Sequence, residues 1–256
     1  MSRSPCAPSD PFLTDSLPKR PQPGNGAPFS RQEAYFFSCN KMIIYKQWLS
    51  LLGLLEQLSN AQLLAELFRH PMFLVFVGLV AFFHVSEFTL AAVYDRDNLG
   101  YHSWLISPPY CLALLAACAE YWVESSLFPG MKGPDVVSLV GLVVALLGEA
   151  IRKTGIITAG SSFTHHIRHH REQNHRLITE GIYRYIRHPG YLGWFLWAVG
   201  LQAMLCNPVC FISFAIISWR FFATRIPYEE HFLVTFFGDR YDSYRKRTPT
   251  YIPFIK

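Results

Sequence analysis

Four apolar runs of membrane-spanning length constrain the fold of this chain more than any other feature. Three of them cover residues 71–94, 110–128 and 135–151, and each is close to the roughly 20 apolar residues that one helix needs to cross a bilayer. The fourth covers residues 191–223 and is too long for one span. Because an Asn-Pro pair interrupts it, we expect two antiparallel helices joined by a short turn. The pattern predicts an all-α, multi-pass integral membrane helical bundle, with an all-helical soluble core as the alternative.

The composition agrees with a membrane protein. Of the 256 residues, 51% are hydrophobic and 16% are charged, whereas an average soluble domain is about a quarter charged. The six cysteines contain no CxxC pair and show no disulfide framework. Scattered cysteines in apolar runs usually behave as small hydrophobic residues, so we expect no zinc site built from them.

The N-terminal residues predict a tail rather than a membrane segment. Residues 1–41 are rich in Pro, Ser and Gly and lack the apolar core of a signal peptide. We therefore expect a disordered cytosolic tail over residues 1–41 and an integral-membrane domain over residues 42–256. The polar residues of that domain gather in residues 151–256, which we interpret as its cofactor-binding and catalytic region.

The distribution of basic residues predicts the number of spans. Lys and Arg concentrate in cytosolic loops, and here they gather in the N-terminal tail, in residues 152–190 and in the C-terminal tail. If all three segments face the cytosol, an even number of spans must separate them. A span at residues 47–68, which are Leu-rich but also acidic in places, gives the required count and a total of six helices. The alternative is that residues 47–68 lie on the membrane surface.

Three acids within the apolar runs need an explanation, namely Glu87, Glu120 and Glu124. Acids in such positions usually face the interior of a bundle, where they mark a pathway or a partner. One hypothesis is therefore a transporter or channel that uses these acids as a path, although no inverted repeat supports it. The other is that each acid is neutralised by hydrogen bonds between helices or sits at the membrane interface.

A run of histidines, FTHHIRHHREQNH at residues 163–175, suggests metal binding at first sight. His165 and His169 are four residues apart, a spacing that can place two ligands on one face of a helix. However, the HExxH pattern is missing and no second cluster of ligands follows. We expect no metal site and interpret the run as a basic segment at the membrane interface.

The motif RHPGY at residues 187–191 opens the last apolar stretch, and a second polar stretch follows it at WRFFATRIPYEE. The short turn of the predicted hairpin brings these two ends together. Arg187, His188 and Tyr191 should therefore lie close to Arg225 and to the acids that follow it. They should also lie near Arg220, Glu229 and Glu230. No GxGxxG turn or P-loop is present, so a Rossmann-type cofactor site is not supported.

Several stretches of the chain, taken together and in their order along the sequence, closely resemble the isoprenylcysteine carboxyl methyltransferase family. Besides RHPGY and the Glu229-Glu230 pair, they are FHVSEF (83–88), GEAIRK (148–153), TAGSSFTH (158–165), GWFLWAVGLQAMLCNP (193–208), WRFF (219–222) and FFGDRYDSYRKRTPTYIPFIK (236–256). The resemblance runs from about residue 70 to the end of the chain. It implies a membrane enzyme that uses S-adenosylmethionine to methylate the C-terminal prenylcysteine of CaaX-processed proteins. A phospholipid N-methyltransferase with the same cofactor core is the alternative, because RHPxY and the acid pair are shared with that class.

The resemblance also implies a set of site residues. Arg225 would contact the substrate and act in catalysis. The cofactor would lie against Arg168, His175, Arg176, Leu177, Ile178, Tyr183, His188, Pro189, Gly190, Tyr191 and Glu229. Arg168 and Gly190 depart from the pattern of vertebrate members, which carry Gln and Ser there. The implied partners are the lipid bilayer and prenylated CaaX proteins such as small GTPases, with no nucleic acid. The implied location is the endoplasmic reticulum membrane, with both termini and the active site facing the cytosol.

The expected reaction needs no general base. A C-terminal carboxylate has a reference pKa of about 3.5, so it is already ionised at pH 7. The site must instead desolvate the carboxylate and aim it at the methyl donor. Arg225 is the candidate for gripping it, and Glu229 would complement the positive cofactor. Trp194, Phe195 and Trp197 either line a lipid-facing entrance for the prenyl chain or serve as ordinary interface anchors.

Overall fold

The computed structural model describes residues 67–170 and 176–255. The chain divides into two compact units, Met1–Ser59 and Asn60–Lys256, and every described residue belongs to the second. The predicted tail over residues 1–41 lies outside the described residues, and so does all but the last two residues of the predicted span at 47–68. The total of six membrane-spanning helices therefore stays a prediction.

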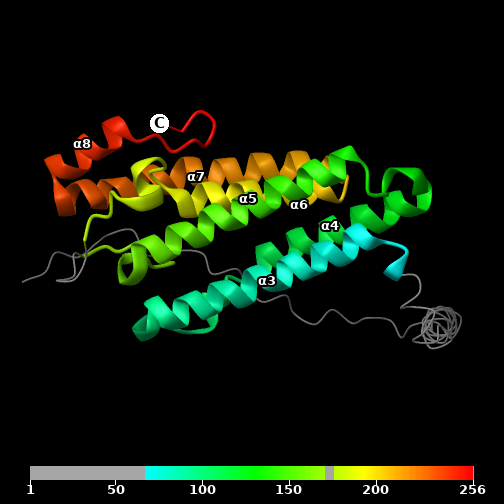
Figure 1. Cartoon of the computed structure of the whole chain (residues 1–256), viewed down its shortest axis with the longest axis horizontal. Helices are drawn as coiled ribbons and strands as arrows, with labels where there is room; N and C mark the ends of the chain where they lie inside the picture. The colour runs from blue at the N-terminus through cyan, green and yellow to red at the C-terminus, as the bar shows by residue number, and fades with distance from the viewer. Residues whose placement is uncertain (1–66, 171–175, 256) are drawn as a thin grey trace, which may run out of the picture. The chain divides into compact units, whose positions relative to one another are not determined.

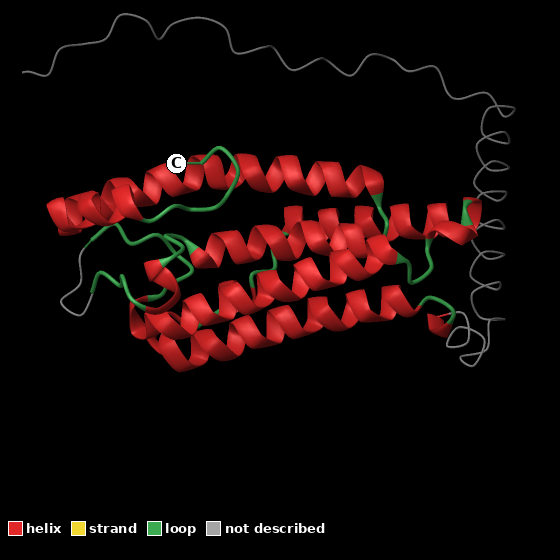
Figure 2. Ribbon diagram, turned by 45° about the horizontal axis from the view of Figure 1, so that its top comes forward, coloured by secondary structure: helices red, strands yellow, loops and turns green. Residues whose placement is uncertain are grey.

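The described residues fold into long helices with short connections (Figures 1 and 2). The long helices are α3 (Pro71–Tyr94), α4 (Pro108–Leu127), α5 (Val136–Ala159), α6 (Pro189–Met204) and α7 (Pro208–Phe237), followed by the shorter α8 (Asp239–Arg247). The 3-10 segments are η1 (Arg96–Asn98), η2 (Tyr101–Trp104), η3 (Pro129–Met131), η4 (Gly160–Ser162) and η5 (Gly181–Arg184). No strand occurs in these parts of the chain, which confirms the all-α prediction.

Three segments of the described chain are long and apolar enough to cross a membrane. They are Pro71–Tyr94, Tyr101–Leu127 and Pro208–Phe237. Helix α6 is shorter, with 16 residues, and α5 carries Glu149, Arg152 and Lys153 in its C-terminal half. The predicted hairpin is confirmed, since α6 and α7 are separated only by the turn that contains Asn207.

Local sequence explains where these helices begin. Helices α3, α4, α6 and α7 each start at a proline, whose fixed φ and missing N–H suit the first position of a helix. Helix α5 starts instead after Asp135, whose Oδ1 accepts a hydrogen bond of 2.7 Å from the backbone N–H of Ser138. That capping bond holds the pKa of the Asp135 carboxyl below its ordinary value.

Helices α5 and α6 pack with their backbones in contact, because glycines face each other. A Cβ on Gly148 would lie 2.4 Å from the backbone nitrogen of Trp197, and one on Gly193 would lie 2.5 Å from the carbonyl oxygen of Gly148. Small residues at helix interfaces allow such close approach in membrane proteins. The contact runs along α5 from Gly141 to Gly155, and Gly155 packs against Pro189, so it fixes the start of α6, where RHPGY lies.

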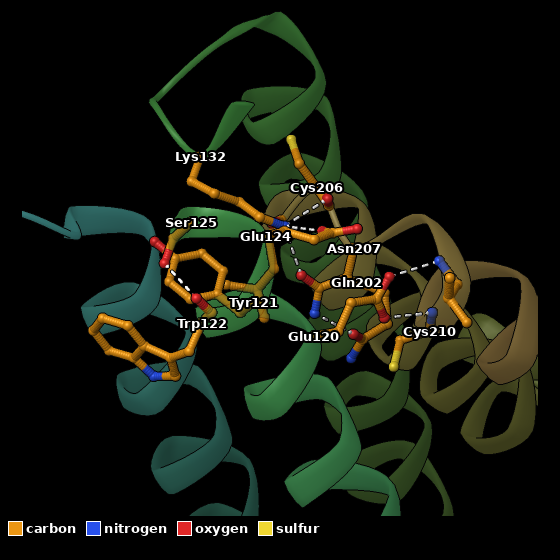
Figure 3. Close-up of polar contacts among 12 residues, drawn as sticks. Glu120, Tyr121, Trp122, Glu124, Ser125, Lys132, Gln202, Cys206, Asn207 and Cys210 are labelled. Carbon is orange, nitrogen blue, oxygen red and sulfur yellow. Dashed lines mark hydrogen bonds and ion pairs between the residues drawn. The ribbon is translucent and has the colours of Figure 1, made fainter. Parts of the chain in front are cut away.

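A buried group of polar residues closes the far end of α6 (Figure 3). We call it the Lys132 cluster; it comprises Lys132, Glu124, Asn207 and the carbonyl groups of Leu205 and Cys206. The Lys132 ammonium donates to Glu124 Oε2 at 2.6 Å, to the two carbonyls at 3.0 and 2.8 Å, and to Asn207 Oδ1 at 2.9 Å. A cation placed on the orphan carbonyls of a helix C-terminus stabilises that end.

The neighbouring acid Glu120 closes the start of α7. Its two carboxylate oxygens each accept a hydrogen bond of 2.7 Å, from the backbone N–H groups of Val209 and Cys210. Anionic groups stabilise helix N-termini. Glu120 and Glu124 are thus satisfied by hydrogen bonds between elements. The structure supports the second of the two hypotheses for these acids rather than a transport path.

Candidate active site

The two predicted polar stretches meet at the opposite end of α6, around a cavity of about 390 Å³. Arg168, Arg176, Leu177, Ile178, Tyr183, His188, Pro189, Gly190, Tyr191, Arg225 and Glu229 all line it. His175 lies outside the described residues. The structure therefore brings together every predicted site residue that it describes. Residues from the 163–168 segment, from α6 and from α7 form walls of this cavity.

Tyr191 stands at the centre of the polar wall, between a cation and an acid. Arg225 donates from Nε to the Tyr191 hydroxyl oxygen at 2.9 Å, and that hydroxyl donates to Glu229 Oε2 at 2.5 Å. Both α7 residues lie on one face because the helix continues through Pro227. A second guanidinium nitrogen of Arg225, Nη2, donates to the carbonyl oxygen of His165 at 2.9 Å. The cavity thus presents a positive and a negative group one helical turn apart.

The adjacent acid, Glu230, has a different role from Glu229. Its Oε1 accepts from Arg187 Nε at 2.6 Å and lies 2.9 Å from His188 Nε2. Arg187 also donates from Nη1 to the carbonyl oxygens of Thr248 and Arg245, at 2.5 and 3.0 Å. This buried group ties the RHPGY turn to α7 and to the segment after α8. The acid pair is therefore divided between the cavity and the scaffold.

Mostly aromatic side chains form another part of the lining, which we call the aromatic wall. It comprises Phe83, His84, Leu105, Tyr110, Trp194 and Phe222, and it adjoins the polar wall, because the ring of Phe222 packs 5.1 Å from that of Tyr191. The ring of His84 is held at both nitrogens, with Nδ1 2.7 Å from the carbonyl oxygen of Trp104 and Nε2 2.9 Å from the hydroxyl of Tyr110. One cavity thus combines a charged wall with an apolar one, which suits a reactant that has both kinds of surface.

Comparison with known proteins now decides the family. The sequence model of the isoprenylcysteine carboxyl methyltransferase family matches residues 139–235, which include both glycine-packed helices, the RHPGY turn, Arg225 and Glu229. Protein-S-isoprenylcysteine O-methyltransferase B of Arabidopsis thaliana is 50% identical over 177 residues, 69% of this chain and 90% of that protein. The chain belongs to the isoprenylcysteine carboxyl methyltransferase family. It is therefore a membrane methyltransferase.

More distant members of the isoprenylcysteine carboxyl methyltransferase family agree in sequence and in fold. The human protein-S-isoprenylcysteine O-methyltransferase is 41% identical over 179 residues, 69% of this chain and 63% of the human protein. A solved structure of a eukaryotic intramembrane Ras methyltransferase of this family superposes with a TM-score of 0.71 at 39% identity. The superposition covers 73% of this chain and 68% of that one.

In this member of the family, a further buried group of charges contacts the cavity, since two of its members line it. We call it the Glu87 cluster; it comprises Glu87, Glu149, Arg152, Lys153 and His165. Glu87 accepts from Arg152 Nε and Nη2 at 2.7 Å each, and from Lys153 Nζ at 2.5 Å. His165 Nε2 lies 2.8 Å from Oε2 of Glu87. Lys153 also pairs with Glu149 at 3.2 Å.

The Glu87 cluster changes the interpretation of two basic residues. Arg152 and Lys153 belong to the basic segment that the sequence assigned to a cytosolic loop. In the structure both lie within α5, and Glu87 neutralises them. They therefore say little about topology. Sequence reasoning singled out Glu87 as a buried acid but did not identify its partners, because Arg152 lies 65 positions away.

Two tyrosines beside the cavity remain protonated at neutral pH. Burial raises the pKa of the Tyr183 phenol well above its ordinary value, and the nearby Glu229 carboxylate raises it further. Burial likewise raises the pKa of Tyr244, whose hydroxyl donates to the Tyr183 carbonyl at 2.7 Å. These phenols can donate hydrogen bonds, but they do not act as bases near pH 7.

The histidine segment is not helical where the structure describes it, up to residue 170. The helical spacing of His165 and His169 therefore has no structural consequence. His165 contacts Glu87, the ring of His166 packs 4.7 Å from that of His102, and the ring of His169 packs 5.0 Å from that of Phe232. Within residues 67–170 and 176–255, no three His, Cys, Asp or Glu side chains converge as metal ligands would.

The three aromatics predicted for the lipid entrance have different surroundings. Trp194 lines the cavity, and Phe195 packs against the buried residues shared by α6 and α7. Trp197 is only 2% exposed and stacks on Phe83 with ring centroids 4.1 Å apart. Neither alternative holds for Trp197, because Phe83 of α3 covers its ring inside the bundle.

Proposed function

We propose that this chain transfers a methyl group from S-adenosylmethionine to the C-terminal α-carboxylate of a prenylated cysteine, which gives a methyl ester. The observation that carries the proposal is the arrangement Arg225–Tyr191–Glu229, in which a guanidinium and a carboxylate flank one hydroxyl inside a cavity that aromatic side chains also line. The names of the relatives specify S-isoprenylcysteine as their methyl acceptor. This favours prenylcysteine over a phospholipid as the substrate.

The residues present fit S-adenosylmethionine, which supplies an electrophilic methyl group on a positively charged sulfur. The cavity volume of about 390 Å³ is within the usual range for small-molecule sites. The Glu229 carboxylate complements the positive charge of the cofactor. The ring of Tyr191, whose hydroxyl donates to Glu229, stacks on the ring of His188 with centroids 5.4 Å apart. Aromatic faces attract cations. We therefore retain Arg168, Arg176, Leu177, Ile178, Tyr183, Pro189 and Gly190 as proposed cofactor contacts, together with His175.

Arg225 is the proposed catalytic and substrate-binding residue. Its guanidinium is half-buried and already oriented by Tyr191 and by the His165 carbonyl. A pre-oriented guanidinium binds a carboxylate with little further loss of entropy. No proton has to be removed, because the carboxylate is ionised at pH 7 and the tyrosines nearby are neutral. The chain contributes orientation and exclusion of water.

The aromatic wall is the proposed contact for the prenyl chain. Burial of a lipid chain is worth about 0.8 kcal/mol per CH₂, so a prenyl group remains in an apolar environment while its carboxylate enters the polar half. We propose that the prenyl group reaches Phe83, Tyr110 and Trp194 from the bilayer. S-adenosylmethionine would arrive from the aqueous side.

The proposed substrates are CaaX proteins such as small GTPases after prenylation and proteolytic trimming. The proposed location is the endoplasmic reticulum, with the active site on the cytosolic face and residues 151–256 as the catalytic region. Loss of the carboxylate charge would favour attachment to an anionic leaflet by about 1 kcal/mol. That gain gives the methylation a physical consequence for its substrate.

The proposed function is tested by methyl transfer with the purified full chain. The protein is incubated with radiolabelled S-adenosylmethionine and either a farnesylcysteine analogue, a geranylgeranylcysteine analogue or phosphatidylethanolamine. We expect base-labile label on one or both prenylcysteines and none on the phospholipid. Label on the phospholipid alone, stable to base, would reverse the assignment.

A further inference from the structure

Glu87 lies outside the cavity but contacts two residues that line it. It sits in the C-terminal half of α3, its side chain is fully buried, and it takes no part in the chemistry proposed above. Of its three basic partners, Arg152 and His165 line the cavity and Lys153 does not. A fully buried carboxylate with three basic neighbours is costly to assemble unless every contact is well made, so its contacts should constrain their neighbours.

The first path runs from Glu87 through Arg152 to the proposed cofactor turn. Arg152 grips both carboxylate oxygens with Nε and Nη2, and its remaining nitrogen, Nη1, donates to the carbonyl oxygen of Gly190 at 2.8 Å. A bidentate guanidinium–carboxylate pair fixes the plane of the guanidinium. The position of the Gly190 carbonyl, in the first turn of α6, therefore depends on Glu87.

The second path runs from Glu87 through His165 to the proposed carboxylate-binding residue. His165 Nε2 lies 2.8 Å from Glu87 Oε2, and the His165 carbonyl oxygen accepts from Arg225 Nη2 at 2.9 Å. His165 belongs to an irregular segment after η4, where no helix holds the backbone in place. The contact with Glu87 is thus an anchor for the carbonyl that orients Arg225.

We propose that Glu87 is a positioning residue for methyl transfer: through Arg152 and His165 it aligns the methyl-donor turn at Gly190 with the carboxylate-binding Arg225. This inference rests on the proposed function. The competing explanation is that the Glu87 cluster only stabilises the fold, as the Lys132 cluster does. The Lys132 cluster provides the matched comparison, because its members lie at the other end of α6, about 24 Å away for 16 residues at 1.5 Å each.

The test compares three variants of the full chain in the same detergent. Glu87→Gln weakens both paths. Lys153→Met removes a partner of Glu87 that reaches neither Gly190 nor Arg225. Glu124→Gln disrupts the buried ion pair of the Lys132 cluster, far from the cavity. For each we would measure the Kd for S-adenosylmethionine by calorimetry, kcat and KM with a farnesylcysteine analogue, and the Tm.

We expect Glu87→Gln to lower kcat at least about tenfold and to weaken S-adenosylmethionine binding several-fold, as the loss of charged hydrogen bonds implies. Lys153→Met and Glu124→Gln should keep kcat and Kd within about twofold of the wild type, although their Tm falls. Unchanged kcat and Kd in Glu87→Gln would overturn the proposal. The proposal would also be overturned if Glu124→Gln lost as much kcat and cofactor affinity as Glu87→Gln at a similar fall in Tm.

A second pair of variants isolates the path to Arg225. His165→Phe keeps a ring against Phe163 but removes the contact with Glu87, whereas His165→Gln retains a side-chain N–H that can donate to it. We expect His165→Phe to lower kcat with the Kd for S-adenosylmethionine within about twofold, and His165→Gln to restore most of the loss. A structural role alone predicts no such rescue, and its absence would remove this path from the proposal. If Glu87→Gln does not fold, this pair still tests the path from Glu87 to Arg225.

The same measurements separate this inference from the proposed function. If the wild type binds S-adenosylmethionine but leaves both the farnesylcysteine and the geranylgeranylcysteine analogue unmethylated, the proposed substrate is wrong. The Kd of Glu87→Gln then still tests the path through Arg152, because it needs no acceptor. If the wild type is active and Glu87→Gln is equally active with an unchanged Kd, only the role of Glu87 is wrong.

Discussion

The two ends of α6 carry buried charges of the same types in different arrangements. At the C-terminal end, the Lys132 ammonium is surrounded by Glu124, two carbonyls and Asn207, and the chain itself satisfies the group (Figure 3). At the N-terminal end, Arg225 and Glu229 face a cavity. Glu87 lies outside it and pairs with Arg152 and His165, which line it. A buried charge by itself therefore does not mark a functional site. What distinguishes the active end is that its charges border a space that a ligand can fill.

The difference also separates the roles of the Lys132 cluster and the Glu87 cluster. The Lys132 cluster closes a turn between helices, where orphan backbone groups would otherwise be left in an apolar environment. The Glu87 cluster lies between α3, α5 and the segment after η4, and it supports groups that must stay aligned. Loss of charge should thus affect stability at one end and turnover at the other. The predictions below test that division.

The largest effect is expected for Arg225→Ala. Loss of the guanidinium should lower kcat/KM by about a hundredfold or more, because charged hydrogen bonds in a desolvated site are worth several kcal/mol. The Kd for S-adenosylmethionine should stay within about threefold. Steady-state methylation of a farnesylcysteine analogue and calorimetric cofactor binding measure the two quantities. Arg225→Lys, which keeps the charge but not the planar fork, should fall between the wild type and Arg225→Ala.

Glu229→Ala should have the next largest effect, and this effect should fall on the binding of S-adenosylmethionine rather than of the methyl acceptor. Loss of the carboxylate that complements a positive cofactor should weaken S-adenosylmethionine binding by about tenfold or more. Calorimetry with purified protein measures this directly. Glu229→Gln keeps the size and the hydrogen-bonding oxygen, so a similar loss there would assign the effect to charge. Normal cofactor affinity in both variants would exclude Glu229 from the cofactor site.

At the closed end, Lys132→Met should destabilise the protein without affecting catalysis. Breaking a buried ion pair by removing one partner costs about 3–5 kcal/mol, and Lys132 and Glu124 are both largely buried. We expect a clear fall in Tm with kcat and Kd within about twofold. Adding Glu124→Gln in the same chain should recover part of the Tm. Strong loss of kcat in a folded Lys132→Met protein would mean that the two ends are coupled.

The smallest effect is expected from pH. If the acceptor carboxylate is already ionised and no base is needed, kcat should vary by less than about twofold between pH 6 and pH 9. The raised pKa values of Tyr183 and Tyr244 keep both phenols protonated throughout this window. A pH–rate profile at saturating substrates measures this. A steep fall towards pH 6 would instead show that a proton transfer contributes to the rate.

Much of the fold could be predicted from the sequence, because the features that determine it lie within short stretches of the chain. Apolar runs have the length of helices, and the Asn-Pro pair marks the turn between α6 and α7. The site was predictable by a similar route, since the short turn requires RHPGY and Arg225 to meet. The division of labour between Glu229 and Glu230 was not predictable, because it depends on which side of α7 faces the segment after α8.

Contacts between distant parts of the chain escaped the sequence reasoning. Lys132 lies in a polar connection outside the apolar runs, and nothing local points to its partners 73 to 75 positions away. One signal was available but unused: Gly141, Gly148 and Gly155 recur every seven residues, as do Gly193 and Gly200. Such a stripe places glycine on one helix face.

The most direct test of the central claim is a structure of the full chain with S-adenosylhomocysteine and a farnesylcysteine analogue bound together. Our account predicts the acceptor carboxylate within about 3 Å of the Arg225 guanidinium. It also predicts the cofactor sulfur on the Glu229 and Gly190 side of Tyr191 and the farnesyl chain against Phe83 and Trp194. A carboxylate bound by another residue, with Arg225 directed away from it, would contradict the account.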